Sequence, residues 1–283
     1  MDLFRIDKND LNNLKDDIKN IYETEGAFIV ENLLEINIFE EIIEDLIQIC
    51  YEYDPRLYER YGSIKNNLEK ANKCLLNIYS NKNESQSIIY DAMSRSVSLH
   101  RFAANRKIIN VLEFILSKKI LIHNRLILIM SMPNQGWHLA RWHQDYYYNE
   151  GPKNTCTIYA PLQRISSHNG GLIIAKNSPL KGLLDHGDHS FDPPTKYHTI
   201  NQDKINSFTE TDKVKISMNP GDVLFMHSLC AHSAQINKSN DVRFVVNFRY
   251  QDITDKDFKS NNWQVGSIHH AKVALKREAK TNT

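Results

Sequence analysis

Several features that identify whole classes of protein are missing from this sequence. Its 283 residues include only four cysteines, at positions 50, 74, 156 and 230, and no two of them form a CxxC pair. A disulfide scaffold and a zinc knuckle are therefore unsupported, and reduced thiols in a cytoplasmic protein are the simplest interpretation. The formal net charge is only +1, so no long-range field attracts nucleic acid or an anionic membrane.

Long apolar runs and a targeting signal are also missing. The longest apolar runs, at 108–116 and 126–132, are far too short to span a bilayer. The start, MDLFRIDKNDLNN, has no basic region followed by an apolar stretch, as a signal peptide would. We therefore expect a soluble, cytoplasmic, globular protein with no nucleic-acid partner and no membrane span. The pattern predicts no oligomeric state.

The patterning divides the chain into a helical front and a strand-rich back. Helical periodicity is clear at 38–50 and 106–117 and weaker at 9–22 and 64–80. From Ile120 onward, short β-branched and aromatic runs alternate with turn residues, which is typical of an antiparallel sandwich or barrel. The polar stretch 185–212, which contains His186, His189 and His198, is expected to be mostly a long loop.

The segment RWHQDYYYNEG, 141–151, contains a histidine and an aspartate two residues apart. In a strand, side chains two apart share a face, so His143 and Asp145 can point at one position. One imidazole and one carboxylate are two of the three ligands in the facial triad of non-haem iron(II) enzymes. The third ligand would be a distant histidine, for which His232 is the candidate and His227 the rival. An HxD triplet alone is weak, because most histidines have no metal.

Arg243 sharpens the hypothesis. It follows His232 by eleven residues and begins an apolar run. A guanidinium pointing into an apolar barrel needs an anionic partner, and its fork suits a carboxylate. A 2-oxoacid cosubstrate would provide one. The alternative is a structural ion pair with Asp222 or Asp241.

Four segments carry a resemblance to a known family: WHQD (142–145), NGGLIIAKNSPLKG (169–182), NPGDVLFMHSLCAHSAQINKS (219–239) and the opening GAFIVENLLEINIFEEI (26–42). Together with Arg243, they resemble the phytanoyl-CoA dioxygenase-like family of Fe(II)/2-oxoglutarate-dependent oxygenases. The resemblance implies a mainly β protein with N-terminal helices, whose core is a double-stranded β-helix (a jelly-roll or cupin barrel) with helices packed on one sheet. The implied arrangement is a single oxygenase domain over 1–283, with helical support at 1–118, the jelly-roll core at 119–252 and an extension at 253–283.

The resemblance also implies a site. His143, Asp145 and His232 would bind Fe(2+) and act in catalysis, and Arg243 would bind the distal carboxylate of 2-oxoglutarate, with O2 as the oxidant. One departure is Ala234, where many members have a serine or threonine beside that carboxylate. Because Asp145 occupies the position that related halogenases leave open for halide, we expect hydroxylation of an unactivated C–H bond, with succinate and CO2 as coproducts.

Strand alternation extends the list of candidate residues. Arg141 and Tyr147 would share the face of the metal ligands, and Arg249 would share the face of Arg243 with Val245 and Asn247. The alternate residues Phe244, Val246, Phe248 and Tyr250 would form a separate apolar face. Arg141, Tyr147 and Arg249 could bind a small polar substrate, although arginines at strand ends often form surface salt bridges.

Two hypotheses from other classes remain. A non-oxidative cupin, such as a zinc or manganese isomerase, could use the same two histidines and one carboxylate. A ligand-binding relative without turnover could retain them as well. Arg243 discriminates between these hypotheses, because an isomerase has no particular need for an arginine at that spacing.

Overall fold

The protein is described by a computed structural model that covers residues 2–81, 85–122, 126–136, 139–149, 152–187 and 199–257. Its strands are β1 (Phe4–Asp7), β2 (Ala27–Glu31), β3 (Ile120–Ile122), β4 (Ile127–Ser131), β5 (Cys156–Pro161), β6 (Leu172–Ala175), β7 (His186–Gly187), β8 (Thr199–Ile200), β9 (Lys213–Lys215), β10 (Val223–His227), β11 (His232–Ala234) and β12 (Arg243–Asp252). Each of the apolar runs that the sequence predicts to be strands after Ile120 contains at least one of these observed strands.

The helices are concentrated in the first part of the chain. They are α1 (Lys15–Thr24), α2 (Glu40–Tyr53), α3 (Arg56–Tyr61), α4 (Asn67–Asn81), α5 (Ser85–Met93), α6 (Val97–Ala103), α7 (Arg106–Ile115), α8 (Asp145–Asn149) and α9 (Gln202–Asn206), with short 3-10 helices η1 (Ile36–Phe39) and η2 (Ser178–Lys181). The four helical patterns in the sequence correspond to α1, α2, α4 and α7. No helix of the described ranges combines the length and the apolar character needed to cross a membrane.

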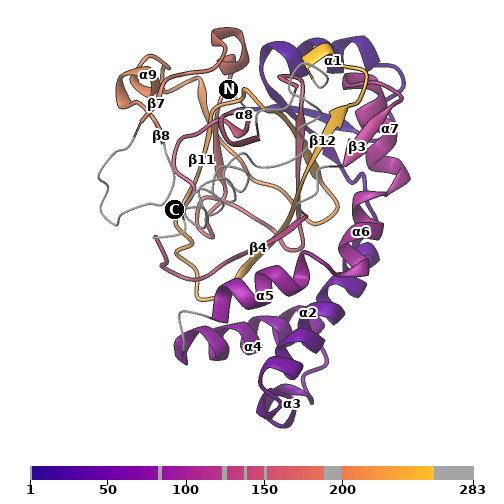
Figure 1. Cartoon of the computed structure of the whole chain (residues 1–283), viewed down its shortest axis with the longest axis vertical. Coiled ribbons are helices and arrows are strands. Elements are labelled where there is room, and N and C mark those ends of the chain that lie inside the picture. Colours follow the sequence, from indigo (N-terminus) through magenta and orange to yellow (C-terminus); the bar gives the residue numbers. More distant parts are fainter. Residues whose placement is uncertain are drawn as a thin grey trace, which may run out of the picture.

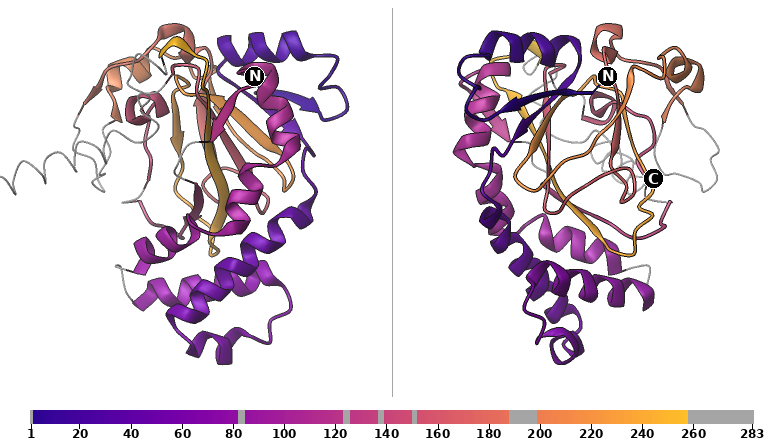
Figure 2. Two further views of the ribbon diagram at one scale, coloured as in Figure 1. Left: turned by 45° about the vertical axis from the view of Figure 1, so that its right-hand side comes forward. Right: turned by 180° about the vertical axis from the view of Figure 1, so that it is seen from behind.

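Seven strands form a major sheet in the order β1-β2-β10-β5-β12-β3, and β4 also pairs with β12. The sheet therefore includes two strands from the mostly helical front of the chain. Only β1 and β2 pair in parallel, and the other pairs are antiparallel. Figures 1 and 2 show the strands at the centre, with α6 and α7 along one side and α2 to α5 beyond one end.

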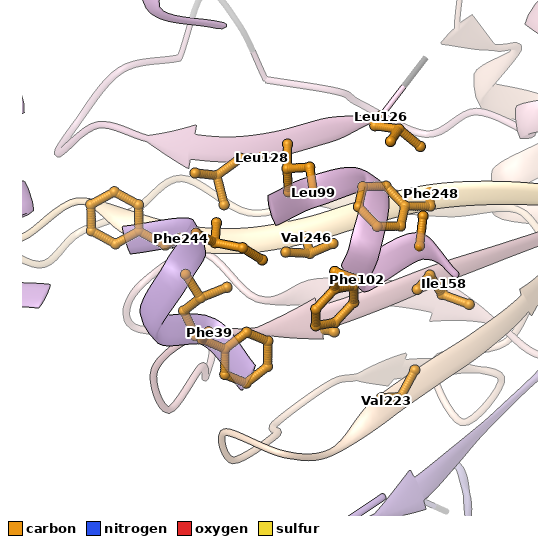
Figure 3. Close-up of a cluster of buried hydrophobic side chains, with 14 of the residues drawn as sticks. Phe39, Leu99, Phe102, Leu126, Leu128, Ile158, Val223, Phe244, Val246 and Phe248 are labelled. Atoms are coloured by element: carbon orange, nitrogen blue, oxygen red, sulfur yellow. The ribbon is translucent and has the colours of Figure 1, made fainter. Parts of the chain in front are cut away.

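The two faces of the major sheet have different partners because side chains alternate along each strand. Phe244, Val246 and Phe248 of β12 belong to a large apolar cluster with residues of α1, α2, α4, α6 and α7. Figure 3 shows Val246 and Phe248 near Phe102 of α6, with Phe244 further along the strand, and the Phe102 and Phe248 rings meet edge to face with centroids 5.8 Å apart. The predicted apolar face of this strand is confirmed.

The opposite face of the major sheet packs against a minor sheet of three strands, in the order β11-β6-β9. A second apolar cluster joins Tyr159 and Val245 of the major sheet to Leu172, Ile174 and Val214 of the minor sheet. We call the space between the two sheets the interior. Arg243, Val245, Asn247 and Arg249 alternate with the helix-packed residues of β12, so they share the face directed toward this interior.

The polar stretch 185–212 differs from the expected long loop. It contains the short pair β7 and β8 and the helix α9. The residues between 187 and 199, with His189 and His198, lie outside the described residues. Backbone hydrogen bonds hold the described part of this stretch against its neighbours: Ile200 N donates to Trp142 O, and Asn201 N donates to Asp185 O.

Candidate metal centre

The segment around His143 and Asp145 is not a continuous strand, so that expectation was wrong. His143 forms an isolated antiparallel bridge with His232, in which His143 N donates to His232 O at 2.9 Å and His232 N donates to His143 O at 3.0 Å. Two residues later, Asp145 begins the helix α8. Tyr147 therefore lies in a helix. The chain turns sharply between the two residues, and this turn brings both side chains to one position.

The three predicted ligands meet. One potential ligand atom from each of His143, Asp145 and His232 lies within 4.8 Å of the others. Nε2 of His143 is 3.8 Å from Oδ1 of Asp145, and the two imidazole centroids are 4.2 Å apart. Asp145 and His232 are buried, and His143 is half-buried. Among the described residues, these form the group with metal-ligand geometry.

The rival His227 lies on the other side of the major sheet. Its ring packs against Tyr22 of α1 with centroids 5.0 Å apart, and its Nδ1 accepts a hydrogen bond from the Leu229 backbone N–H at 3.0 Å. Burial lowers the pKa of His227 to about 4. The alternation along β10 explains the outcome, because His227 shares the face of Val223 and Phe225, which pack on the helices.

Backbone carbonyls orient both imidazoles of the candidate centre. Nδ1 of His143 lies 2.7 Å from Arg141 O, and Nδ1 of His232 lies 3.0 Å from Cys230 O. Only a protonated Nδ1 can donate to a carbonyl, so each ring keeps an Nε2 lone pair for a metal. Burial, helped by the nearby His232, lowers the pKa of His143 to about 3. Burial also lowers the pKa of His232, so both rings are neutral at pH 7.

Two side chains hold the carboxylate of Asp145. Thr157 Oγ1 donates to Oδ2 at 2.6 Å, and Arg249 Nη2 donates to Oδ1 at 2.7 Å. Burial raises the pKa of Asp145, but Arg249, His232 and His143 together outweigh it and hold this pKa below its ordinary value. The carboxylate is therefore charged and ready to bind a cation. Arg249 forms a buried ion pair here, not the surface salt bridge considered from the sequence.

Arg243 is buried, with 3% of its surface exposed, and has an incomplete set of partners. Its Nη2 donates to Ser131 Oγ at 2.5 Å, whereas Nε and Nη1 are buried without a hydrogen-bond partner. The alternative acidic partners are engaged elsewhere: Asp222 accepts from the backbone N–H groups of Asn32 and Asn219, and Asp241 accepts from Asn72. A structural ion pair for Arg243 with either residue is therefore wrong.

The interior near these residues is mostly apolar. Its lining includes Ile129, Leu172 and Met226, and Ala234 packs against the same cluster. Tyr159 contributes a hydroxyl that is buried and has no hydrogen-bond partner. Buried polar groups are normally satisfied, so the N–H groups of Arg243 and the hydroxyl of Tyr159 that have no partner among the described residues suit a ligand rich in acceptors.

An aromatic group lies beside the candidate centre. Tyr147 stacks on His186 with centroids 4.2 Å apart and planes 10° from parallel, and Tyr148 meets His143 edge to face at 5.8 Å. Gln144 is fully buried; its amide donates to Gly182 O and Leu229 O and accepts from Leu184 N. These bonds attach the ligand segment to its neighbours. Sequence reasoning missed this role, because none of the three contacts is local.

Comparisons with known proteins agree with this picture. The family model described as phytanoyl-CoA dioxygenase (PhyH) matches residues 22–245. A Caenorhabditis elegans protein described as probable phytanoyl-CoA dioxygenase is 27% identical over 139 residues, which are 47% of this chain and 43% of that protein. The matched stretch thus spans less than half of the relative.

Solved structures show the same fold. The non-heme monooxygenase ThoJ in its apo form is 16% identical, with 84% of this chain and 78% of that chain covered and a TM-score of 0.60. EctD from S. alaskensis with 2-oxoglutarate and 5-hydroxyectoine is 16% identical, with 83% and 75% covered and a TM-score of 0.57. The epimerase SnoN in complex with Fe3+, alpha ketoglutarate and nogalamycin RO is 15% identical, with 86% and 85% covered and a TM-score of 0.55. The expected jelly-roll architecture with helices on one sheet is confirmed.

Proposed function

Because the chain belongs to the phytanoyl-CoA dioxygenase (PhyH) family, we propose that it is an Fe(II)- and 2-oxoglutarate-dependent dioxygenase. In this proposal it hydroxylates an unactivated C–H bond of a small polar metabolite. Dioxygen and 2-oxoglutarate are consumed, and succinate and CO2 are released. The solved relatives supply a precedent, since one of them holds Fe3+ with alpha ketoglutarate and another holds 2-oxoglutarate.

The observation that carries the proposal is the partly unpaired guanidinium of Arg243, whose Nη2 alone has a hydrogen-bond partner among the described residues. Two of its nitrogens, Nε and Nη1, are buried without an acceptor among the described residues, on the face of β12 that also directs Arg249 to the candidate metal ligand Asp145. A carboxylate that accepts from both would complete the set and cancel a buried charge. A dicarboxylate with a keto acid at its other end offers one group for such an arginine and a second group for a metal.

The metal ligands fit iron(II) by their donor set. Two neutral imidazoles and one carboxylate are the facial set that leaves positions open for cosubstrate and oxygen. The bound metal would supply oxygen activation and oxidative decarboxylation of the cosubstrate. The chain itself orients the ligands through the carbonyls of Arg141 and Cys230. Its apolar lining excludes water from the reacting groups.

The substrate would bind on the side of the centre where α8 lies. We propose Tyr147 as a substrate-binding residue because it belongs to the aromatic group beside His143, and Arg141 because its carbonyl oxygen lies 2.7 Å from Nδ1 of His143. The sequence also predicted Arg249 as a substrate-binding residue. That role stays a prediction, because the hydrogen bond described for Arg249 is to Asp145 and not toward a substrate. We further propose a single domain acting in the cytoplasm, which four free, buried cysteines support.

An anaerobic absorbance titration tests this function. Apo protein receives Fe(II) and then 2-oxoglutarate, and the weak visible charge-transfer band of the chelate is recorded. We expect the band in the wild type, a loss in Asp145→Ala and a weakening in Arg243→Ala. Arg56→Ala is the matched control, because Arg56 pairs with Asp54 on the surface. An iron-loaded wild type that binds no 2-oxoglutarate at millimolar concentration would falsify the proposal.

The same titration separates the main alternative. A non-oxidative cupin would bind zinc or manganese tightly and give no chelate band with iron and 2-oxoglutarate. A binding protein without turnover would give the band but would release no succinate in air. Succinate assays on the wild type and on Arg243→Ala, run with candidate small metabolites, distinguish this second case.

A further inference from the structure

Two neighbouring strands of the major sheet hold the candidate carboxylate ligand from one side. Thr157 of β5 and Arg249 of β12 are direct cross-strand partners. Thr157 Oγ1 donates to Oδ2 of Asp145, and Arg249 Nη2 donates to Oδ1. Asp145 itself comes from a third element, at the start of α8. The orientation of this carboxylate is thus set by a pair of residues far away in the sequence.

The two oxygens of Asp145 are not equivalent. Oδ1 accepts from Arg249 at 2.7 Å and lies 3.8 Å from Nε2 of His143, so it is the oxygen nearest to this candidate ligand. Oδ2 accepts a short hydrogen bond from Thr157, at 2.6 Å, inside a region where Asp145 is only 2% exposed. Turning Oδ2 toward a metal would break a buried hydrogen bond to a charged group, which is among the stronger kinds of hydrogen bond.

We propose that Thr157 and Arg249 are positioning residues: Arg249 orients the carboxylate of Asp145, and Thr157 engages Oδ2 so that ligation takes place through Oδ1 alone. This inference rests on the proposed function. With two imidazoles and one carboxylate oxygen, a six-coordinate metal keeps three open positions. A carboxylate that bound through both oxygens would occupy one of these positions, for which 2-oxoglutarate and O2 would then have to compete. The pair therefore keeps a position open.

The decisive variant is Thr157→Val, which keeps the branched shape and removes the hydroxyl. The freed Oδ2 competes with 2-oxoglutarate for a metal position. We expect the Kd for 2-oxoglutarate, read from the chelate band, to rise by about 10-fold or more, within the 10–100-fold range typical of lost outer contacts. The Kd for Mn(II) alone should change less than the Kd for 2-oxoglutarate, because the second oxygen of Asp145 can replace the lost contact with a bond to the metal. A merely structural role would weaken metal binding first.

Matched variants isolate the effect. Thr155→Val removes an equally buried hydroxyl on the same strand side, but Thr155 donates to the Pro152 carbonyl and touches no candidate ligand. It should leave both Kd values as in the wild type. Thr157→Ser restores the donor and should restore 2-oxoglutarate binding. Arg249→Lys keeps the charge but loses the planar fork, so it provides a second, independent perturbation of the same carboxylate.

The visible absorption spectrum of the Co(II)-substituted protein reports the coordination of the metal when no 2-oxoglutarate is present. We expect the visible spectrum of Thr157→Val to differ from that of the wild type, whereas Thr155→Val and Thr157→Ser match it. If the wild type binds no 2-oxoglutarate, the proposed function fails, and this comparison still decides the role of Thr157. Unchanged spectra with unchanged Kd values overturn the inference. So does weaker Mn(II) binding with 2-oxoglutarate affinity retained.

Discussion

Replacing Arg243 with methionine should make the ligand-free protein more stable. Nε and Nη1 are buried without acceptors, and an unsatisfied buried group costs about 1–3 kcal/mol, so the two together cost roughly 4 kcal/mol. The substitution loses the hydrogen bond to Ser131, which as a bond from a charged donor contributes about 2 kcal/mol. The free energy of unfolding of Arg243→Met should therefore exceed that of the wild type by about 2 kcal/mol.

The same substitution at Arg249 should have the opposite sign. Arg249 lies six residues further along the same strand and neutralises the buried Asp145. Breaking a buried ion pair leaves an uncompensated charge and costs about 3–5 kcal/mol. Urea denaturation with chelator present, followed by tryptophan fluorescence, compares both variants with the wild type.

Adding the cosubstrate should reduce or reverse the stability difference between Arg243→Met and the wild type. With Mn(II) bound and 2-oxoglutarate at about 100 times the wild-type Kd, the wild type gains about 2.7 kcal/mol, whereas Arg243→Met, which binds the cosubstrate more weakly, gains less. A ligand-free Arg243→Met that is less stable than the wild type would refute the reasoning, because the guanidinium would then have partners that offset its burial. Equal stabilisation of both proteins by 2-oxoglutarate would remove Arg243 from the binding site.

Three further outcomes are expected. Burial lowers the pKa of His227 from 6.5 to about 4 in the folded state, so the unfolded chain binds more protons between these values and stability falls as pH falls. Between pH 7 and pH 5 the apo wild type should lose about 2 kcal/mol more stability than His227→Asn in urea denaturation. Parallel pH profiles of the two proteins would contradict this. Phe248→Ala should lower the free energy of unfolding by about 3–5 kcal/mol, since Phe248 is fully buried against Phe102; a thermal midpoint within 2 °C of the wild type would contradict the packing. Gln144→Leu leaves one N–H and two carbonyls without their partner and should cost about 2–4 kcal/mol in the same denaturation assay, whereas a neutral result would mean that solvent replaces the amide.

Much of the candidate centre could be predicted because its signals are local or periodic. Alternation along 243–250 separates Arg243 and Arg249 from Phe244 and Phe248, and the structure has the same two faces. The distant ligand His232 could be chosen over His227 by family resemblance, and the same alternation, applied to β10, places His227 on the helix side. An alternating sequence pattern predicts the two faces of a strand reliably, because successive side chains of a strand always point to opposite faces.

What escaped prediction depends on long-range contacts or on a local change of geometry. The chain leaves the bridge at His143 and enters a helix at Asp145, although the aromatic run after it favours a strand. The helix is compatible with tertiary bonds such as that from Tyr146 N to Ser228 O. The role of Thr157 could have been suspected from the alternation of β5, but its contact with Asp145 requires the folded topology.

The strand β12 also places a condition on folding. It pairs with β5 on one side and with β3 and β4 on the other, and it has no glycine or proline in its ten residues. A slip of one residue against these neighbours would exchange its faces, burying two guanidinium groups among the helices and exposing phenylalanines to the interior. A misregistered chain would thus fail in packing and in ligand capture together.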